Sequence, residues 1–79
     1  MKEKILDILA EVCEDDVVKE DLGMDLFEEG LLDSMGVAQL LMETEDELGV
    51  VIALTEIQRE DINTPEKIIS LIMGRAGRS

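Results

Sequence analysis

Asp33-Ser34-Met35-Gly36 marks the point where an acidic, glycine-containing loop ends and a segment with helical periodicity begins. Asp33 or Ser34 can cap the first turn of a helix through a side-chain oxygen, and Gly49 suits the left-handed position that ends one. The sequence therefore predicts a helix from Ser34 to about Leu48. Its inward stripe recurs at helical spacing and consists of Val37, Leu40, Leu41, Thr44 and Leu48.

The segment before this helix divides into a helix and a long loop. Residues 2–13 carry apolar side chains at the spacing of one helical face, namely Ile5, Leu6, Leu9, Val12 and Cys13. Residues 14–33 lose that period, are rich in acids and contain Gly23 and Gly30. We expect them to form a long loop that lies over the core, with Phe27 as its main anchor.

The segment after the helix is predicted in three parts. Residues 50–54 have the composition of a strand, but without a strand to pair with they are expected to form an extended apolar connector. Residues 55–60 are expected to form one short helical turn. Thr64 and Pro65 form a typical helix start; we expect Gly74 to end this last helix and residues 75–79 to be a frayed tail.

Length and composition indicate a single all-α domain over residues 1–79: three main helices, one short helix and a long first loop. The chain has 79 residues, of which 46% are hydrophobic, and Phe27 is its only aromatic residue, so the core must be aliphatic. Its 20 acids and 7 bases give a net charge of −13. This charge argues against binding nucleic acid or anionic membranes, favours a monomer, and predicts partners with basic surfaces.

Several features predict a cytoplasmic protein. Residues Met1–Ile5 alternate in charge and lack the apolar run of a signal peptide. The longest apolar stretch, Val50–Leu54, is too short to cross a bilayer. Cys13 is the only cysteine, so it permits no internal disulfide. Its place on the helical stripe indicates a small buried hydrophobe.

The sequence lacks the residue patterns of the common catalytic sites. The chain has no histidine, so a Ser-His-acid triad is impossible, and Leu32 stands where a nucleophile elbow requires glycine. Adjacent acids such as Glu28 and Glu29 are inevitable in so acidic a chain and do not indicate a catalytic pair. We expect no catalytic residue and no specific metal site.

Ser34 has two possible roles. It can act only as a helix cap, as most serines at helix starts do. Alternatively, its hydroxyl can carry a phosphate diester, which would face the unpaired N–H groups and the positive dipole end of the helix. The residue types around it leave both readings open.

The outer face of the same helix is the expected docking surface for partner proteins. Methionine adapts its shape to different surfaces, and acids steer a protein toward basic partners. The residues expected to bind partners are Met35, Ala38, Gln39, Met42, Glu43 and Asp46.

The order of elements resembles the acyl carrier protein family, and within it the D-alanyl carriers of Gram-positive bacteria. Fatty-acid carriers more often have Asp-Ser-Leu at the corresponding site, and peptidyl carriers have Gly-Gly-x-Ser. Ile62 stands where D-alanyl carriers commonly have a tryptophan. Three stretches carry the resemblance: Phe27-Glu28-Glu29-Gly30-Leu31-Leu32-Asp33-Ser34-Met35-Gly36, Gln58-Arg59-Glu60-Asp61 and Asn63-Thr64-Pro65-Glu66-Lys67-Ile68.

The resemblance implies a non-catalytic carrier that a phosphopantetheinyl transferase modifies on Ser34, between the flanking residues Asp33, Met35 and Gly36. The arm would take D-alanine as a thioester from an ATP-dependent D-alanine–carrier ligase. A membrane O-acyltransferase would then use it to esterify lipoteichoic acid. The alternatives are a carrier for fatty acid, polyketide or another amino acid, or an acidic interaction module in which Ser34 is only a cap.

Overall fold

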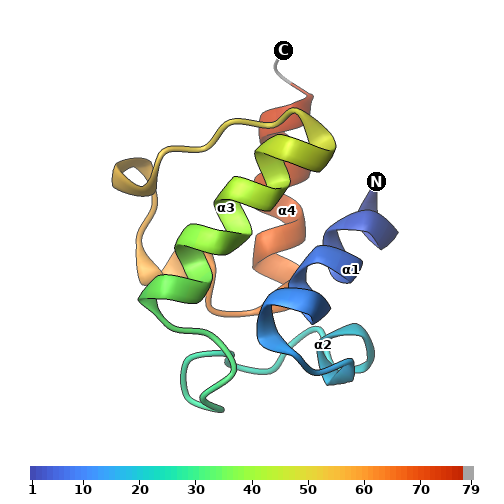
Figure 1. Ribbon diagram of the computed structural model, residues 1–79. Coiled ribbons are helices and arrows are strands. Elements are labelled where there is room, and N and C mark those ends of the chain that lie inside the picture. Colours follow the sequence, from blue (N-terminus) through green and yellow to red (C-terminus); the bar gives the residue numbers. More distant parts are fainter. Residues whose placement is uncertain (78–79) are drawn as a thin grey trace.

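Helices account for all the regular secondary structure in residues 1–77, the part of the chain that the computed structural model describes (Figure 1). Figure 1 shows α3 crossing in front of α4, with α1 beside them. The predicted all-α fold and the predicted helices over residues 2–13 and 34–48 are confirmed. The elements are α1 Lys2–Cys13, α2 Val17–Glu20, α3 Ser34–Leu48, the 3-10 turns η1 Leu54–Glu56 and η2 Arg59–Asp61, and α4 Pro65–Ala76.

The core is aliphatic, as the composition requires. α1 packs against α2, α3 and α4, and burial of this apolar surface is the main force that holds the helices together. Thr44 is also buried, and its hydroxyl donates a hydrogen bond of 2.7 Å to the Leu40 carbonyl oxygen. The side chains that are almost fully buried include Ile5, Leu9, Val18, Leu26, Leu40, Ile68 and Ile72.

Leu26, and not Phe27, anchors the long loop, so that prediction is wrong. The Asp25 carboxylate accepts hydrogen bonds from the N–H groups of Phe27 and Glu28, at 3.0 Å each, and this turns the chain. Leu26 then has no exposed surface, whereas Phe27 is only half-buried. The Leu26 N–H also donates to the Asn63 carbonyl oxygen at 2.7 Å, which joins the loop to the segment before α4.

The short helix α2 lies within the predicted loop and was not expected. Its single turn carries no detectable helical period. An ion pair of 2.7 Å between Lys19 Nζ and Asp7 Oδ1 fastens it to α1. The Val18 side chain is fully buried beneath it.

Residues 50–54 form the expected extended connector, with Val50 and Ile52 buried and Val51 exposed. The single helical turn predicted for residues 55–60 is wrong, because Ile57 and Gln58 are extended and separate η1 from η2. Each turn is closed by its own acid. Glu56 accepts from the Ala53 N–H at 2.9 Å and Asp61 accepts from the Gln58 N–H at 2.8 Å.

The start of α4 is as predicted, because Thr64 Oγ1 accepts a hydrogen bond from the Lys67 N–H at 3.2 Å and Pro65 is the first helical residue. The predicted end at Gly74 is wrong, since the helix continues to Ala76. Glycine inside a helix costs only about 1 kcal/mol. Arg75 also holds the last turn, through a contact of 3.1 Å between Nη2 and Glu56 Oε1.

These contacts mean that Arg75 and Ala76 do not belong to a frayed tail. Gly77 caps this helix, α4, and its N–H donates to the Met73 carbonyl oxygen at 3.1 Å. The last two residues of the predicted tail, 78–79, lie outside the described residues. The Ala53 N–H and the Arg75 guanidinium together hold the pKa of the Glu56 carboxyl below its ordinary value.

Asp33 caps α3, which decides between the two predicted capping residues. Its Oδ1 accepts a hydrogen bond of 2.8 Å from the Gly36 N–H. A Cβ atom at Gly36 would lie 3.0 Å from Leu32 Cδ1 and 3.4 Å from Asp33 Oδ1, so glycine allows the loop to pack closely on the helix. Ser34 is the first helical residue, and its exposed hydroxyl has no hydrogen-bond partner within residues 1–77.

We therefore predict that Asp33→Ala lowers the free energy of unfolding by about 1 kcal/mol, because it removes the cap. Ser34→Ala should change that free energy by less than about 0.5 kcal/mol, as at ordinary exposed positions. Urea unfolding followed by circular dichroism measures both. An equal loss in the two variants would show that Ser34 takes part in capping.

Candidate functional site

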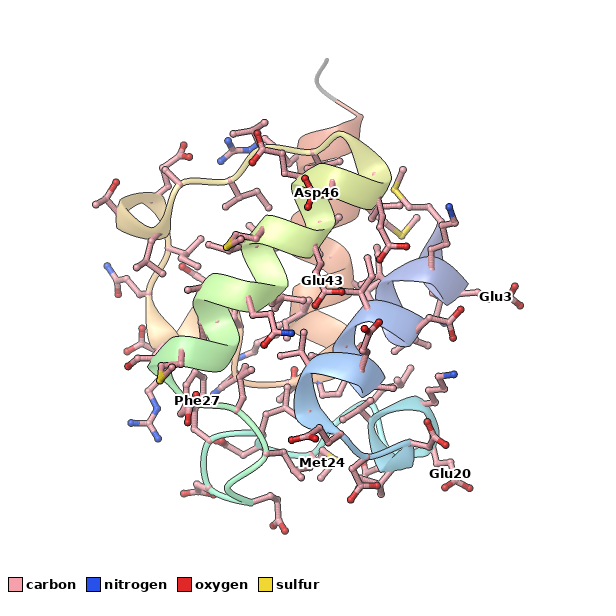
Figure 2. All side chains as sticks on the ribbon, in the orientation of Figure 1. Glu3, Glu20, Met24, Phe27, Glu43 and Asp46 are labelled. Atoms are coloured by element: carbon pink, nitrogen blue, oxygen red, sulfur yellow. The ribbon has the colours of Figure 1, made fainter. Side chains whose placement is uncertain are left out.

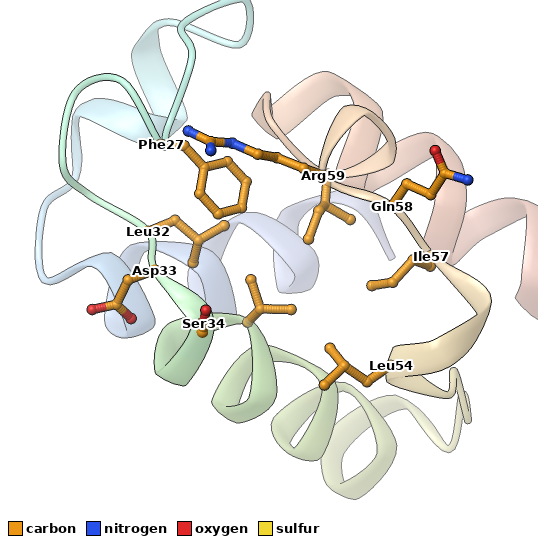
Figure 3. A pocket seen from close by; sticks show the side chains of 10 residues that line it. Phe27, Leu32, Asp33, Ser34, Leu54, Ile57, Gln58 and Arg59 are labelled. Atoms are coloured by element: carbon orange, nitrogen blue, oxygen red, sulfur yellow. The ribbon is translucent and has the colours of Figure 1, made fainter.

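Ser34 opens onto a groove of about 500 Å³ between α3, the long loop and the two 3-10 turns (Figure 3). The floor and walls of the groove are mostly apolar, and Asp33, Gln58 and Arg59 supply polar groups at its edge. The Ser34 hydroxyl is therefore accessible beside a hollow in the surface. The apolar lining consists of Phe27, Leu32, Val37, Leu54, Ile57 and Ile62.

The position of Ser34 at the first turn of α3 favours a negatively charged substituent on its hydroxyl. The first N–H groups of a helix have no partner within the helix, and the helix dipole places partial positive charge there. Asp33 satisfies the Gly36 N–H, but its carboxylate leaves the hydroxyl of Ser34 unoccupied. The hydroxyl thus lies at a helix end that can stabilise a phosphate diester.

Five residues of the groove lining come from the segment between α3 and α4, and Arg59 and Ile62 are two of them. Arg59 of η2 places its guanidinium carbon 4.5 Å from the centre of the Phe27 ring, a cation–π contact that Figure 3 shows at one edge of the groove. Ile62 is only 3% exposed. The smaller side chain thus fills the buried position where a tryptophan is common in D-alanyl carriers.

The predicted outer face of α3 is exposed as expected. Met35 and Met42 are 82% and 65% exposed, and a second groove of about 620 Å³ runs beside them between α1 and α3. Ala38, Gln39 and Asp46 are also exposed, and Glu43 is half-buried. Gln39 Nε2 donates to Glu43 Oε2 at 3.2 Å. Figure 2 shows Glu43 and Asp46 along this helix; partner binding by these residues stays a prediction.

The chain has no histidine, and the carboxylate of Asp33, the acid that lines the groove beside Ser34, already accepts a hydrogen bond from the Gly36 N–H. Within the described part of the chain, no group of three His, Cys, Asp or Glu residues could hold a metal ion. Cys13 is buried, as predicted, and burial together with the Asp15 charge raises the pKa of its thiol to about 11. The Cys13 thiol is therefore a poor nucleophile. Among residues 1–77, no helix has the length and hydrophobicity to span a membrane.

The structure brings together Asp33, Ser34, Met35 and Gly36 as the sequence requires, but it adds residues that sequence reasoning missed. Arg59, Leu54 and Ile57 reach the groove from the opposite side. Arg59 belongs to one of the stretches that carry the family resemblance, but no local pattern placed any of the three beside Ser34, because they lie far from it along the chain.

The environment of Ser34 fits a covalently attached phosphate ester: an exposed and unbonded hydroxyl, a helix N-terminus and an open groove. Comparison with known proteins agrees with this chemistry. Residues 3–72 match the protein family described as "Phosphopantetheine attachment site".

Curated relatives are similar over most of their length. The chain is 46% identical to the D-alanyl carrier protein of Bacillus subtilis over 69 residues, which cover 87% of this chain and 88% of the relative. The Bacillus velezensis protein gives the same identity and coverage. A Bacillus cereus relative is 47% identical over 68 residues, 86% of each chain.

The family match covers nearly the whole chain, and the relatives are identical to it at almost half of the aligned residues. The fold and the open serine at the start of α3 agree with both findings. The chain thus belongs to the acyl carrier family, whose members bear covalent phosphopantetheine, and it is similar to the D-alanyl carrier proteins within that family.

Proposed function

We propose that Ser34 is the attachment residue for phosphopantetheine and that the loaded chain carries D-alanine as a thioester. The observation that supports this most strongly is the Ser34 hydroxyl itself, which is exposed, released from capping by Asp33, and open to the groove. The relatives named D-alanyl carrier protein support the choice of cargo.

Phosphopantetheine supplies a terminal thiol, which the chain lacks at this site because Cys13 is buried in the core. The residues around Ser34 hold its hydroxyl in position on the surface. Asp33 fixes the first turn of α3, and Gly36 lets Leu32 pack against that turn. Ser34 is thereby held at a defined place on the surface where a transferase can reach it.

Three partners follow from this proposal: a phosphopantetheinyl transferase, an ATP-dependent D-alanine–carrier ligase and a membrane O-acyltransferase that esterifies lipoteichoic acid. The net charge of −13 supports steering toward basic surfaces on such enzymes. The exposed methionines of α3 supply an apolar contact beside Ser34. A cytoplasmic monomer suits the loading steps.

Incubation with coenzyme A and a broad-specificity phosphopantetheinyl transferase should add one phosphopantetheine to the wild-type chain. Ser34→Ala should add none, because it removes the acceptor oxygen. Ser70→Ala, a matched change at an exposed serine of α4, should be modified as fully as the wild type. Intact mass spectrometry measures the increment. An increment that persists in Ser34→Ala would place the arm elsewhere.

The cargo is tested with the phosphopantetheine-loaded protein, ATP and a D-alanine–carrier ligase. We expect an increment of one alanyl group that is released by hydroxylamine, as a thioester is, and no comparable increment with L-alanine. Intact mass measures both. Acylation by a fatty-acyl synthetase, with none by the D-alanine ligase, would favour a fatty-acid carrier.

The outer face of α3 is tested with Met42→Asp, which places a charge in the expected contact. We predict slower loading of Ser34 by the transferase, at least tenfold in kcat/KM, a loss of about 1.4 kcal/mol in transition-state stabilisation. Helicity should not change, since Met42 is 65% exposed. The matched control Met73→Asp alters an exposed methionine of α4 and should load normally. Equal loading of both variants would remove Met42 from the interface.

A further inference from the structure

Arg59 interacts differently from the other cations that make contacts in this acidic chain. Lys19 pairs with Asp7 at 2.7 Å, and Arg75 pairs with Glu56 at 3.1 Å. Within residues 1–77, Arg59 has no carboxylate at ion-pair distance, although the chain has 20 acids. Its one contact of note is the face of the Phe27 ring, at 4.5 Å.

Stacking on Phe27 leaves the guanidinium of Arg59 able to bind an anion. An arginine that lies over an aromatic face keeps the N–H groups on its edge directed outward, where they can donate to an oxyanion. Phosphate oxygens match the spacing of two such donors, so these charge-assisted hydrogen bonds are strong and specific in geometry.

The groove joins Arg59 to Ser34, because both residues line it. Figure 3 shows the Arg59 side chain extending from η2 toward Phe27. Phe27 lies on the same side of the groove as Leu32, Asp33 and Ser34. Arg59 is the only lysine or arginine among the described residues of this lining.

A positive partner near Ser34 would stabilise a phosphodiester on its hydroxyl. Asp33, the preceding residue, contributes a negative charge, and its carboxylate is already engaged with the Gly36 N–H. The helix dipole supplies only partial positive charge. A full charge from Arg59 would offset the repulsion between the phosphodiester and Asp33.

We infer that Arg59 is a positioning residue that binds the phosphodiester of the arm and directs the arm over the groove, away from Met35 and Met42. This inference rests on the proposed attachment to Ser34. The outer face of α3 then stays uncovered for partner proteins while the arm is docked. Partner binding or high salt would release the arm by weakening the contact with Arg59.

The test is nuclear magnetic resonance on the full-length, phosphopantetheine-loaded protein. We expect the phosphorus-31 resonance of the diester to shift in Arg59→Gln relative to the wild type. Lys67→Gln, the same loss of charge at an exposed residue of α4 outside this groove, should leave the resonance in place. In the wild type, the Arg59 Nε–H signal should shift between the unloaded and loaded proteins.

Equal phosphorus-31 resonances in the wild type and Arg59→Gln, with an unchanged Arg59 Nε–H signal, would overturn the inference. The wild-type Arg59 signal decides the matter even if Arg59→Gln does not fold. Intact mass on the same samples separates the two proposals. If Ser34 is loaded but the Arg59 Nε–H signal and the phosphorus-31 resonance do not change, only the role of Arg59 is overturned. If Ser34 is not modified, the proposed attachment and the role of Arg59 are both overturned.

Discussion

The hydrogen bond between the Asp33 carboxylate and the Gly36 N–H fixes the turn on which the proposed function depends. It sets the first residue of α3, and it satisfies a helix N–H group without using the Ser34 hydroxyl. In the same turn, Leu32 packs closely against Gly36, where a side chain would leave too little room. The hydroxyl of a serine at a helix start usually caps the helix. Here Asp33 caps α3, so the Ser34 hydroxyl is not used for capping.

The rest of the chain holds this turn in place mainly by apolar packing. The aliphatic side chains of α1, α3 and α4 form the core, and the long loop is fixed to it by the buried Leu26 and by the Leu26–Asn63 backbone hydrogen bond. The acids remain largely on the surface. This division suits the proposed function, in which the chain meets several enzymes in succession, because surface charge speeds encounter while the small core holds one shape.

Local signals predicted α3 and the start of α4, because their caps lie next to periodic apolar residues. Other features depend on contacts between distant residues. Helix α2 is one turn held by Lys19 and Asp7, and Arg75 extends α4 past Gly74 by reaching Glu56. Hydrophobicity alone predicts the larger Phe27 ring as the anchor of the loop. The turn at Asp25 instead directs Leu26 into the core. The sequence around Ser34 was enough to propose it as the attachment residue, but no sequence pattern predicted the opposite wall of its groove.

The contact between Arg75 and Glu56 links the far end of the chain to that wall. Arg75 also donates to the Val51 carbonyl oxygen at 3.5 Å, and Glu56 closes the turn that carries Leu54. The last turn of α4 therefore braces the connector whose side chains border the groove. A change in the position of the last turn of α4 would therefore be passed through Arg75 and the connector to a site that lies at the opposite end of α3.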